Sequence, residues 1–424
     1  MRVIPWFAGA AVVAVLGASA LADTLRTPSD DYPTIQDAIN DAGEGDTVLI
    51  APGIYTQDIE IDERSGIIIR GTGRCVLRGT GIYASYCEGL RIQGITFQDI
   101  QGNAIDLYRC DDVLVTRVTI NGSSGTAIYT EDCDGVQILR NRITGADSDG
   151  IYDYYSDGLV IDGCFVEGSG GDGIYVYGPD NNDGKSGRHY GVAPPSTTPA
   201  EITRNRVSGF YYGIYGGGDG ITIQGNRLNG FEGTGIYYDN SQSSDGVTIE
   251  GNALNAGPGA SYGIFAYVDG SEVRGNYVGN GQSTGIWVYG DDNVIEYNVV
   301  DGNLDGGGWG IYTQGSNATV EENIVRNTSY GLLVSNGEDC IIDGNRVFNP
   351  SSTGIQISVE DSQVLGNHVF RSGGTAFLVT ESGNDFFRNV ANTPPWNGLV
   401  DYYSPGSNTY TQNRFGSTQF NQGD

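Results

Sequence analysis

Short runs of alternating apolar and polar residues recur along the chain, each about 23 residues after the one before. Valine and isoleucine dominate the apolar positions, and glycine, asparagine and aspartate separate the runs. An apolar residue at every second position is typical of a half-buried strand, and the repeats lack the 3.6-residue period of a helix. The pattern therefore predicts three short strands and three turns per repeat, stacked as coils around one shared core.

One asparagine marks the same point in most repeats, within a segment of the form G-V-x-I-x-G-N-x-V. These residues are Asn141, Asn205, Asn226, Asn252, Asn276, Asn298, Asn323, Asn345, Asn367, Asn389 and Asn413. Asparagine tolerates the left-handed backbone of a sharp turn, and amides stacked at the strand spacing of about 4.8 Å can hydrogen-bond to one another. Cys164 falls in the same register. We therefore predict an all-β parallel β-helix of about fifteen coils, about 70 Å long.

The N-terminal 22 residues resemble a targeting segment. Arg2 gives a positive start, an apolar run follows, and the small residues Ala20 and Ala22 form a cleavage site. We expect residues 1–22 to be a signal peptide cleaved near Ala22. The mature protein is then secreted, periplasmic or at the cell surface, without a membrane span.

Residues 23–65 are predicted to form an N-terminal cap and the first coil. Apolar positions 35, 38, 39 and 42 lie on one helical face, and Thr34 with Asp37 has the spacing of a capping box. Such a helix would cover the open end of the solenoid. Residues 66–424 are predicted to be one β-helix domain with a loop insertion at 178–200.

Composition limits the function. The chain has 424 residues, 67 glycines and a formal net charge of -30, so it lacks the basic surface of a general nucleic-acid binder. Cys87, Cys110 and Cys133 are each 23 residues apart and should stack on adjacent coils, within disulfide distance, where only two of the three can pair. Cys340 is expected to pack in the core. We expect a monomer.

Aromatic residues follow a second register. In most coils a Gly-Ile or Ala-Ile pair precedes one residue that strand alternation places outside. Over eight coils these residues are Tyr129, Tyr152, Tyr175, Tyr215, Tyr237, Phe265, Trp287 and Tyr312. The next outward column includes Tyr154, Tyr177, Tyr267 and Tyr289. Aromatic rings pack against sugar rings, so the pattern indicates a groove for an extended glycan, although such ladders also stabilise strands without binding anything.

The insertion contains rare and reactive side chains. The only lysine, Lys185, is followed closely by Arg188 and His189. Asp180 and Asp183 come just before it. This set suits removal of the C5 proton from a uronate, which needs a base with a pKa near the working pH and a cation beside the sugar carboxylate.

The expected roles follow from that chemistry. His189 or a tyrosine would be the base, Arg188 or Lys185 the cation, and Tyr175 or Tyr177 the acid. Asp180 and Asp183 are candidate Ca2+ ligands, and Ca2+ would also screen the repulsion between an acidic protein and a polyuronate. No organic cofactor is expected. The carbanion could expel the C4 oxygen, as in a lyase, or be reprotonated on its opposite face, as in a C5-epimerase.

Two other functions fit the same sequence. A glycoside hydrolase could use paired carboxylates, with Glu131 beside Asp106 or Asp153, although alternation points Asp153 inward between Thr130 and Val176. A non-catalytic glycan-binding or cell-envelope β-helix would need only the aromatic surface.

The cap segment resembles the pectin-lyase-like superfamily of secreted β-helix proteins, whose members open with T-I-Q-x-A-I, G-D-T-V and P-G-x-Y. Here these motifs are residues 34–39, 45–48 and 52–55. The resemblance extends over nearly all of the mature chain and implies a right-handed helix, a fold more than a reaction.

Residues 172–180 are similar to the active-site stretch of mannuronan C5-epimerases. Tyr177, Gly178 and Asp180 match that motif, whereas Asn182 stands where the family has a histidine. Arg188 and His189 are similar to the Arg-His pair of the chondroitinase B and alginate lyase family, whose lysine lies a whole coil earlier. These resemblances imply lyase or epimerase chemistry on a uronate polymer.

Overall fold

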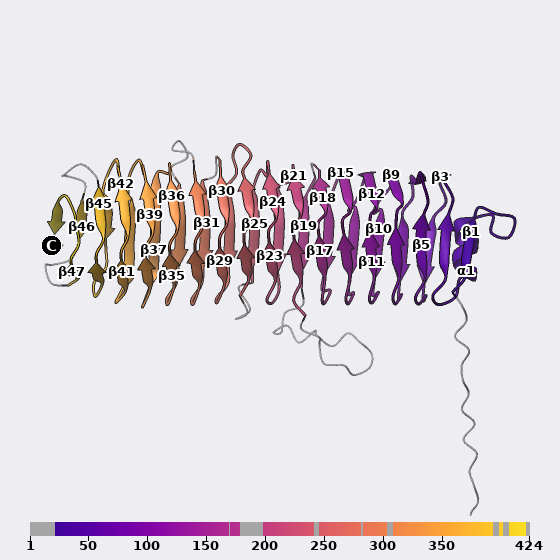
Figure 1. Cartoon of the computed structure of the whole chain (residues 1–424), viewed down its shortest axis with the longest axis horizontal. Helices are drawn as coiled ribbons and strands as arrows, with labels where there is room; N and C mark the ends of the chain where they lie inside the picture. Colours follow the sequence, from indigo (N-terminus) through magenta and orange to yellow (C-terminus); the bar gives the residue numbers. More distant parts are fainter. Residues whose placement is uncertain are drawn as a thin grey trace, which may run out of the picture.

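Three parallel β-sheets run the length of a rod (Figure 1). The computed structural model describes residues 22–168, 170–178, 198–240, 246–280, 283–302, 308–392, 398–401 and 407–420, so residues 1–21 of the expected signal peptide lie outside it. The predicted all-β parallel β-helix is confirmed. Within the described residues, no helix combines the length and the apolar character needed to cross a membrane.

Each complete coil contributes one strand to each sheet, in the order A, B, C. Sheet A contains β1 (Thr24–Thr27), β2 (Thr47–Ile50), β5 (Ile68–Gly71), β8 (Arg91–Gln93), β11 (Leu114–Thr116), β14 (Gln137–Leu139), β17 (Val160–Asp162), β20 (Glu201–Thr203), β23 (Thr222–Gln224), β26 (Thr248–Glu250), β29 (Glu272–Arg274), β32 (Val294–Glu296), β35 (Thr319–Glu321), β38 (Ile341–Asp343), β41 (Gln363–Leu365), β44 (Asp385–Phe387) and β47 (Thr409–Thr411). Sheet B contains β3 (Gly53–Tyr55), β6 (Cys75–Arg78), β9 (Thr96–Ile100), β12 (Thr119–Ser123), β15 (Arg142–Ala146), β18 (Phe165–Glu167), β21 (Arg206–Ser208), β24 (Arg227–Asn229), β27 (Ala253–Asn255), β30 (Tyr277–Gly279), β33 (Val299–Asp301), β36 (Ile324–Arg326), β39 (Arg346–Phe348), β42 (His368–Phe370) and β45 (Val390–Asn392). Sheet C contains β4 (Ile59–Asp62), β7 (Ile82–Ser85), β10 (Ile105–Tyr108), β13 (Ile128–Glu131), β16 (Ile151–Tyr154), β19 (Asp172–Tyr177), β22 (Tyr212–Gly217), β25 (Thr234–Asp239), β28 (Tyr262–Tyr267), β31 (Thr284–Tyr289), β34 (Trp309–Gln314), β37 (Tyr330–Glu338), β40 (Ile355–Glu360), β43 (Phe377–Val379), β46 (Leu399–Asp401) and β48 (Thr418–Phe420).

The core is a stack of aliphatic side chains, one layer per coil. Ile138, Ile161 and Ile202 pair in register on sheet A and are fully buried. Because each strand exposes its other face, residues on either side of these positions point outward. The alternation read from the sequence therefore sets which side chains reach the surface of each sheet.

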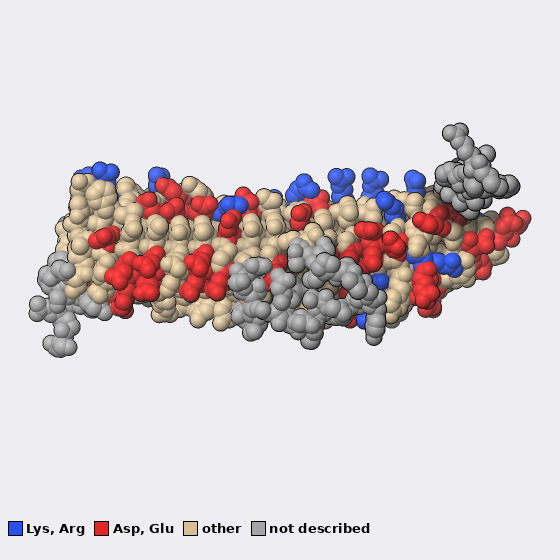
Figure 2. All heavy atoms as spheres, turned by 90° about the horizontal axis from the view of Figure 1, so that it is seen from below, with Lys and Arg blue, Asp and Glu red and all other residues tan. Residues whose placement is uncertain are grey.

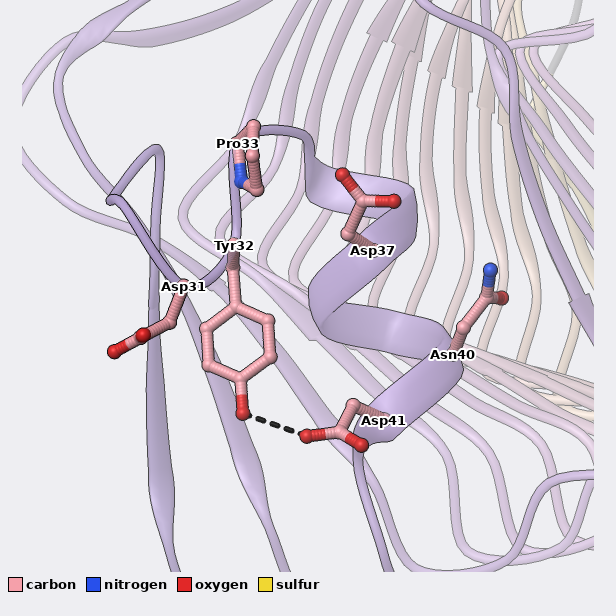
Figure 3. Close-up of a pocket in the computed structure, with 6 residues that line it drawn as sticks. All are labelled: Asp31, Tyr32, Pro33, Asp37, Asn40 and Asp41. Atoms are coloured by element: carbon pink, nitrogen blue, oxygen red, sulfur yellow. Dashed lines mark hydrogen bonds between the residues drawn. The ribbon is translucent and has the colours of Figure 1, made fainter.

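A short helix, α1 (Ile35–Asp41), closes the N-terminal end as predicted. Thr34 Oγ1 accepts a hydrogen bond from the Asp37 N–H (3.1 Å), and Asp37 Oδ2 accepts one from the Thr34 N–H (3.1 Å), which completes the capping box. Beside the helix, the Tyr32 hydroxyl donates to Asp41 Oδ2 (2.6 Å) at the wall of an open acidic pocket (Figure 3). The pocket belongs to the cap, at the N-terminal end of the rod.

The asparagine ladder is confirmed as a continuous chain of buried hydrogen bonds. Asn276 Oδ1, for example, accepts from the Asn252 N–H (2.9 Å), and Asn276 Nδ2 donates to the Ile249 carbonyl (2.8 Å). The expectation of a left-handed backbone at the ladder asparagines is wrong, because none of them has a positive φ. The preceding residue takes that conformation, as at Arg140 (φ 55°) and Tyr297 (φ 55°), because the asparagine amide must point into the coil.

The cysteines stack as predicted, but no disulfide joins them, because all six are buried thiols. Cys110 Sγ accepts from the Cys87 N–H (3.4 Å), and Cys133 Sγ accepts from the Cys110 N–H (3.3 Å). Cys164 stands in the asparagine ladder, where its Sγ accepts from the Asn141 N–H (3.4 Å). These thiols replace amide or hydroxyl acceptors along the rod. Cys340 is buried in the core, as expected.

Candidate functional site

The predicted outward aromatic column lies on sheet C and is continuous over eight coils. We call it the stacked column: Tyr129, Tyr152, Tyr175, Tyr215, Tyr237, Phe265, Trp287 and Tyr312. Tyr152 and Tyr175 have ring centroids 4.5 Å apart and planes 4° apart, and Tyr175 and Tyr215 are 4.7 Å and 11° apart. Only Phe265 and Trp287 meet edge to face, at 85°. The strand spacing therefore aligns most rings face to face along the rod.

This stacking changes what the column can offer a ligand. Each ring is half-buried, and most ring faces are covered by the rings of the neighbouring coils. A sugar could reach the ring edges and phenol hydroxyls, but not the covered faces. Burial raises the pKa of the Tyr152, Tyr175 and Tyr237 phenols, so the hydroxyls stay protonated and donate hydrogen bonds at neutral pH.

The second predicted column presents freer rings. Tyr267 and Tyr289 pair in register, are 37% and 42% exposed, and meet edge to face with centroids 4.6 Å apart and planes at 84°. Tyr154 and Tyr177 also pair in register, with centroids 6.1 Å apart. Because Tyr267 and Tyr289 are perpendicular and exposed, they are better platforms for a sugar ring than the stacked column.

A third aromatic column, at the corner where the chain enters sheet C, escaped the sequence reasoning. Its members, the corner column, are Tyr212, Tyr262, Trp309 and Tyr330, three residues before the outward position of the coil. Tyr212 lies 5.2 Å from the Tyr237 ring and Tyr262 lies 5.4 Å from the Trp287 ring.

A glycine at the corner explains why strand alternation did not predict the corner column. At Gly213 a Cβ would lie 2.4 Å from Leu228 Cδ2 and 2.6 Å from the Gly235 carbonyl oxygen, so only glycine fits the inside of the bend. The bend breaks strict alternation and brings the residue before the glycine back to the surface. The aromatic-Gly-Ile-aromatic motif that starts at Tyr212, Tyr262 and Trp309 is the signal that could have revealed the column, and Tyr330 precedes Gly-Leu-Leu instead. Together the three columns form the aromatic band.

Asp172 stands in the same register as Tyr212, at the N-terminal edge of the corner column. Its N–H donates to Asp149 Oδ1 (2.6 Å), which places the two aspartates on adjacent coils. Burial, followed by the Asp149 charge, raises the pKa of Asp172 to about 7. Asp172 in turn contributes to raising the pKa of the Tyr175 and Tyr212 phenols. A carboxyl group that titrates near neutrality beside an aromatic surface is suited to proton transfer.

Residue type and spacing do not distinguish Asp172 from the many other acidic residues of the chain. Its distinguishing property is the environment, which no residue pattern reports. The loop residues proposed for catalysis, Lys185, Arg188 and His189, and the proposed metal ligands Asp180 and Asp183, lie outside the described residues. Of the predicted catalytic set, Tyr175 and Tyr177 are described, on β19.

The hydrolase pair that used Asp153 is excluded. Asp153 is fully buried, pairs with Thr130 and Val176 on the neighbouring coils, and accepts from Thr130 Oγ1 at 2.5 Å, so its inward position is confirmed and no glycan can reach it. Asp106 and Glu131 stay at the surface, where Glu131 accepts from the Tyr129 hydroxyl (2.8 Å).

Asp153 should make stability depend on pH. Burial raises its pKa to about 6, and its Oδ2 accepts no hydrogen bond from any described residue. The folded protein thus holds this proton more tightly than the unfolded chain, so stability falls as pH rises from about 4 through about 6 and stays reduced above. An Asp153→Asn variant should be more stable than the wild type by about 3 kcal/mol at pH 7–8 and by little at pH 4.

Urea unfolding of both proteins over this pH range measures the difference. The exposed Asp30→Asn substitution is the control. A stability difference between Asp153→Asn and wild type that does not change with pH would contradict the assignment.

A family model described as the right handed beta helix region matches residues 80–253, 191–309 and 262–415. No curated protein matches the chain in sequence.

Several solved structures of low sequence identity are similar to this chain. PfbA, a surface adhesin of Streptococcus pneumoniae, is 15% identical over 84% of this chain and 91% of its own, with a TM-score of 0.42. A tailspike protein of Escherichia coli bacteriophage HK620, in complex with a hexasaccharide, is 12% identical over 82% and 71%, with a TM-score of 0.49. A mannuronic acid specific polysaccharide family 6 lyase from human gut microbiota is 15% identical over 88% and 87%, with a TM-score of 0.37.

Proposed function

The chain belongs to the right-handed β-helix family, and we propose that it is an exported, monomeric, polysaccharide-active protein that holds an extended glycan along sheet C. The observation that supports this most strongly is the aromatic band, which continues over eight coils and has Asp172 in the register of its corner column. A linear polymer lying along the rod would contact ring edges, phenol hydroxyls and exposed tyrosine faces in successive coils.

The preferred chemistry is removal of the C5 proton from a uronate, followed by elimination or reprotonation. Asp172 would take the C5 proton as its carboxylate, because its pKa of about 7 keeps a large ionised fraction at neutral pH. The electron pair left on C5 then either forms the C4–C5 double bond with loss of the C4 oxygen, or accepts a proton on the opposite face. The half-buried phenol of Tyr175 would donate a proton or hydrogen bond, since its raised pKa disfavours a role as base.

The insertion would complete this site. His189 stays an alternative base, Lys185 or Arg188 would neutralise the substrate carboxylate, and Asp180 with Asp183 would hold Ca2+ if the reaction uses it. These roles rest on residue type and on the point where the insertion leaves sheet C, directly after Tyr177.

Incubation with a panel of polymers tests the proposal. The full mature chain would be mixed with alginate, pectate and chondroitin, with and without Ca2+, while the ultraviolet absorbance of unsaturated uronates, the uronate ratio by NMR and reducing ends are followed. A lyase raises the absorbance and an epimerase changes only the ratio. Binding without any of these changes would support the non-catalytic alternative and overturn the catalytic proposal.

Tyr267 gives a direct test of glycan binding by the band. Tyr267→Ala should weaken retention on the polymer about fivefold, because one exposed ring contact of about 1 kcal/mol is lost. Stability should change little, since the ring is 37% exposed. Tyr277 on sheet B is 38% exposed, so Tyr277→Ala is a matched control. Affinity electrophoresis in polymer-containing gels measures both, and equal effects of the two substitutions would refute a binding role for the band.

A further inference from the structure

A row of arginines follows the corner between sheets A and B, which lies across the rod from sheet C. Figure 2 shows basic side chains projecting in a row from one edge of the N-terminal half of the rod, while acidic side chains form several patches on the face shown. We define the arginine strip as the exposed residues Arg117, Arg140, Arg142, Arg204, Arg206 and Arg227. They account for six of the 22 basic residues in a chain of net charge -30, so the local positive charge is exceptional.

Three of these arginines occupy a demanding backbone position. Arg117, Arg140 and Arg204 sit at the turn between sheets A and B with φ of 53°, 55° and 55°. In the same turn of other coils Gly163 and Gly225 take φ of 63° and 64° without strain from a Cβ. Placing arginine there directs a long cationic side chain outward from the corner of the coil.

The other three lie on the adjoining strands of sheet B. Arg142 pairs in register with Phe165, which pairs with Arg206, and Arg206 pairs with Arg227. The Arg142 and Arg206 guanidinium carbons lie 4.3 Å and 5.6 Å from the Phe165 ring centroid. Stacking on both sides of one ring holds the two guanidinium groups in defined orientations and leaves their N–H groups available.

Asp162 neutralises only part of the strip. It accepts from Arg204 Nε at 2.6 Å, and this guanidinium holds the pKa of Asp162 below its usual range. Arg204 nevertheless keeps 74% of its side chain exposed. The strip therefore places cations on four of five successive coils, in a line parallel to the rod axis, with the strand spacing of about 4.8 Å between adjacent coils.

We propose that the arginine strip is a second glycan-binding surface, which takes a linear polyuronate along the rod through its carboxylates. Guanidinium groups bind carboxylates with two parallel hydrogen bonds, and the one-dimensional row matches an extended polymer rather than a flat surface. The charge spacing also favours a polyuronate. A nucleic-acid strand carries a phosphate about every 3.4 Å, closer than the strand spacing of about 4.8 Å, whereas a polyuronate carries one carboxylate per sugar. The choice of a uronate polymer rests on the proposed function, but the strip and the aromatic band are separate surfaces and can fail separately.

The arginine strip would also offset the repulsion between this acidic protein and an anionic polymer. A protein of net charge -30 repels a polyanion at long range. A cationic row that binds the polymer independently of the aromatic band would keep the polymer near the protein. Binding at the strip would then raise the effective concentration of the polymer at sheet C.

The test compares two triple variants of equal charge. Arg117→Gln/Arg140→Gln/Arg142→Gln removes half of the strip. Arg371→Gln/Arg388→Gln/Arg346→Gln is the control, because Arg371 and Arg388 have φ of 54° and 57° and Arg346 starts a strand of sheet B as Arg142 does. Both are run in gels containing alginate, polygalacturonate, dextran sulfate or dextran, over a series of salt concentrations.

The strip variant should bind polyuronate at least tenfold more weakly, and the slope of log affinity against log salt should fall by about 2. The control variant should match the wild type. Equal loss in both variants, unchanged binding by the strip variant, or retention by dextran sulfate but not by polyuronate would overturn the proposal. The strip variant should keep the activity of sheet C on short oligosaccharides. Tyr267→Ala should keep the part of the polyuronate retention that the arginine strip provides. The two results therefore distinguish a wrong proposal for the strip from a wrong proposal for sheet C.

Discussion

Asp172→Asn should lower turnover of the polymer by about 10²- to 10⁴-fold, the usual contribution of a positioned acid or base. Asparagine keeps the size of the side chain and the backbone hydrogen bond to Asp149 but cannot take a proton. The wild-type rate should also rise with pH through about 7, because the carboxylate of Asp172 is the active form and its pKa is about 7. In the variant this rise should disappear while polymer binding is retained.

Glu60→Gln is the matched control for that experiment. Glu60 lies on the outward face of sheet C, in the column that Tyr83 continues, several coils before the aromatic band. Its substitution removes one carboxylate from the same sheet without touching the band. A wild-type rate and pH profile in Asp172→Asn would assign proton transfer to the insertion, and separate alanine variants of Lys185, Arg188 and His189 would then locate it.

Asn276→Ala should destabilise the rod by about 3–5 kcal/mol. Asn276 Oδ1 accepts from the Asn252 N–H (2.9 Å) and Nδ2 (3.0 Å), while its own Nδ2 donates to the Ile249 carbonyl (2.8 Å) and Asn298 Oδ1 (3.0 Å). Alanine leaves several buried polar groups without partners, and each costs about 1–3 kcal/mol. Equilibrium unfolding in urea measures the change.

Two further variants separate the ladder from a general effect of the substitution. Asn255→Ala removes a half-buried amide that donates one bond to Asn229 (3.2 Å) and should cost about 1 kcal/mol or less. Asn276→Cys copies the side chain that Cys164 places in the same ladder, where Sγ accepts from a backbone N–H (3.4 Å), and should cost less than alanine. Equal losses in Asn276→Ala and Asn255→Ala would show that the ladder bonds are not a main source of stability.

Much of the candidate site could be predicted because it depends on register. Tyr152, Tyr175 and Tyr215 align on neighbouring coils since the repeat length and strand alternation place them there, and the same reasoning found the inward Asp153. The corner column with Tyr212 was missed, because the bend at Gly213 interrupts alternation. The cysteines were correctly stacked, but their state as thiols depends on side-chain orientation, which spacing does not define.

The sequence by itself determined the coil repeat, the capping helix, the asparagine ladder and the outward columns, because each follows from a local periodicity that repeats along the chain. Only the tertiary structure decided that ring faces of the stacked column cover one another, that Tyr267 and Tyr289 stay open, and that Asp172 titrates near neutrality. It also brought arginines from separate coils into one strip. Ring orientation, burial and the sum of nearby charges depend on several coils at once, and these decide which outward residues can act on a glycan.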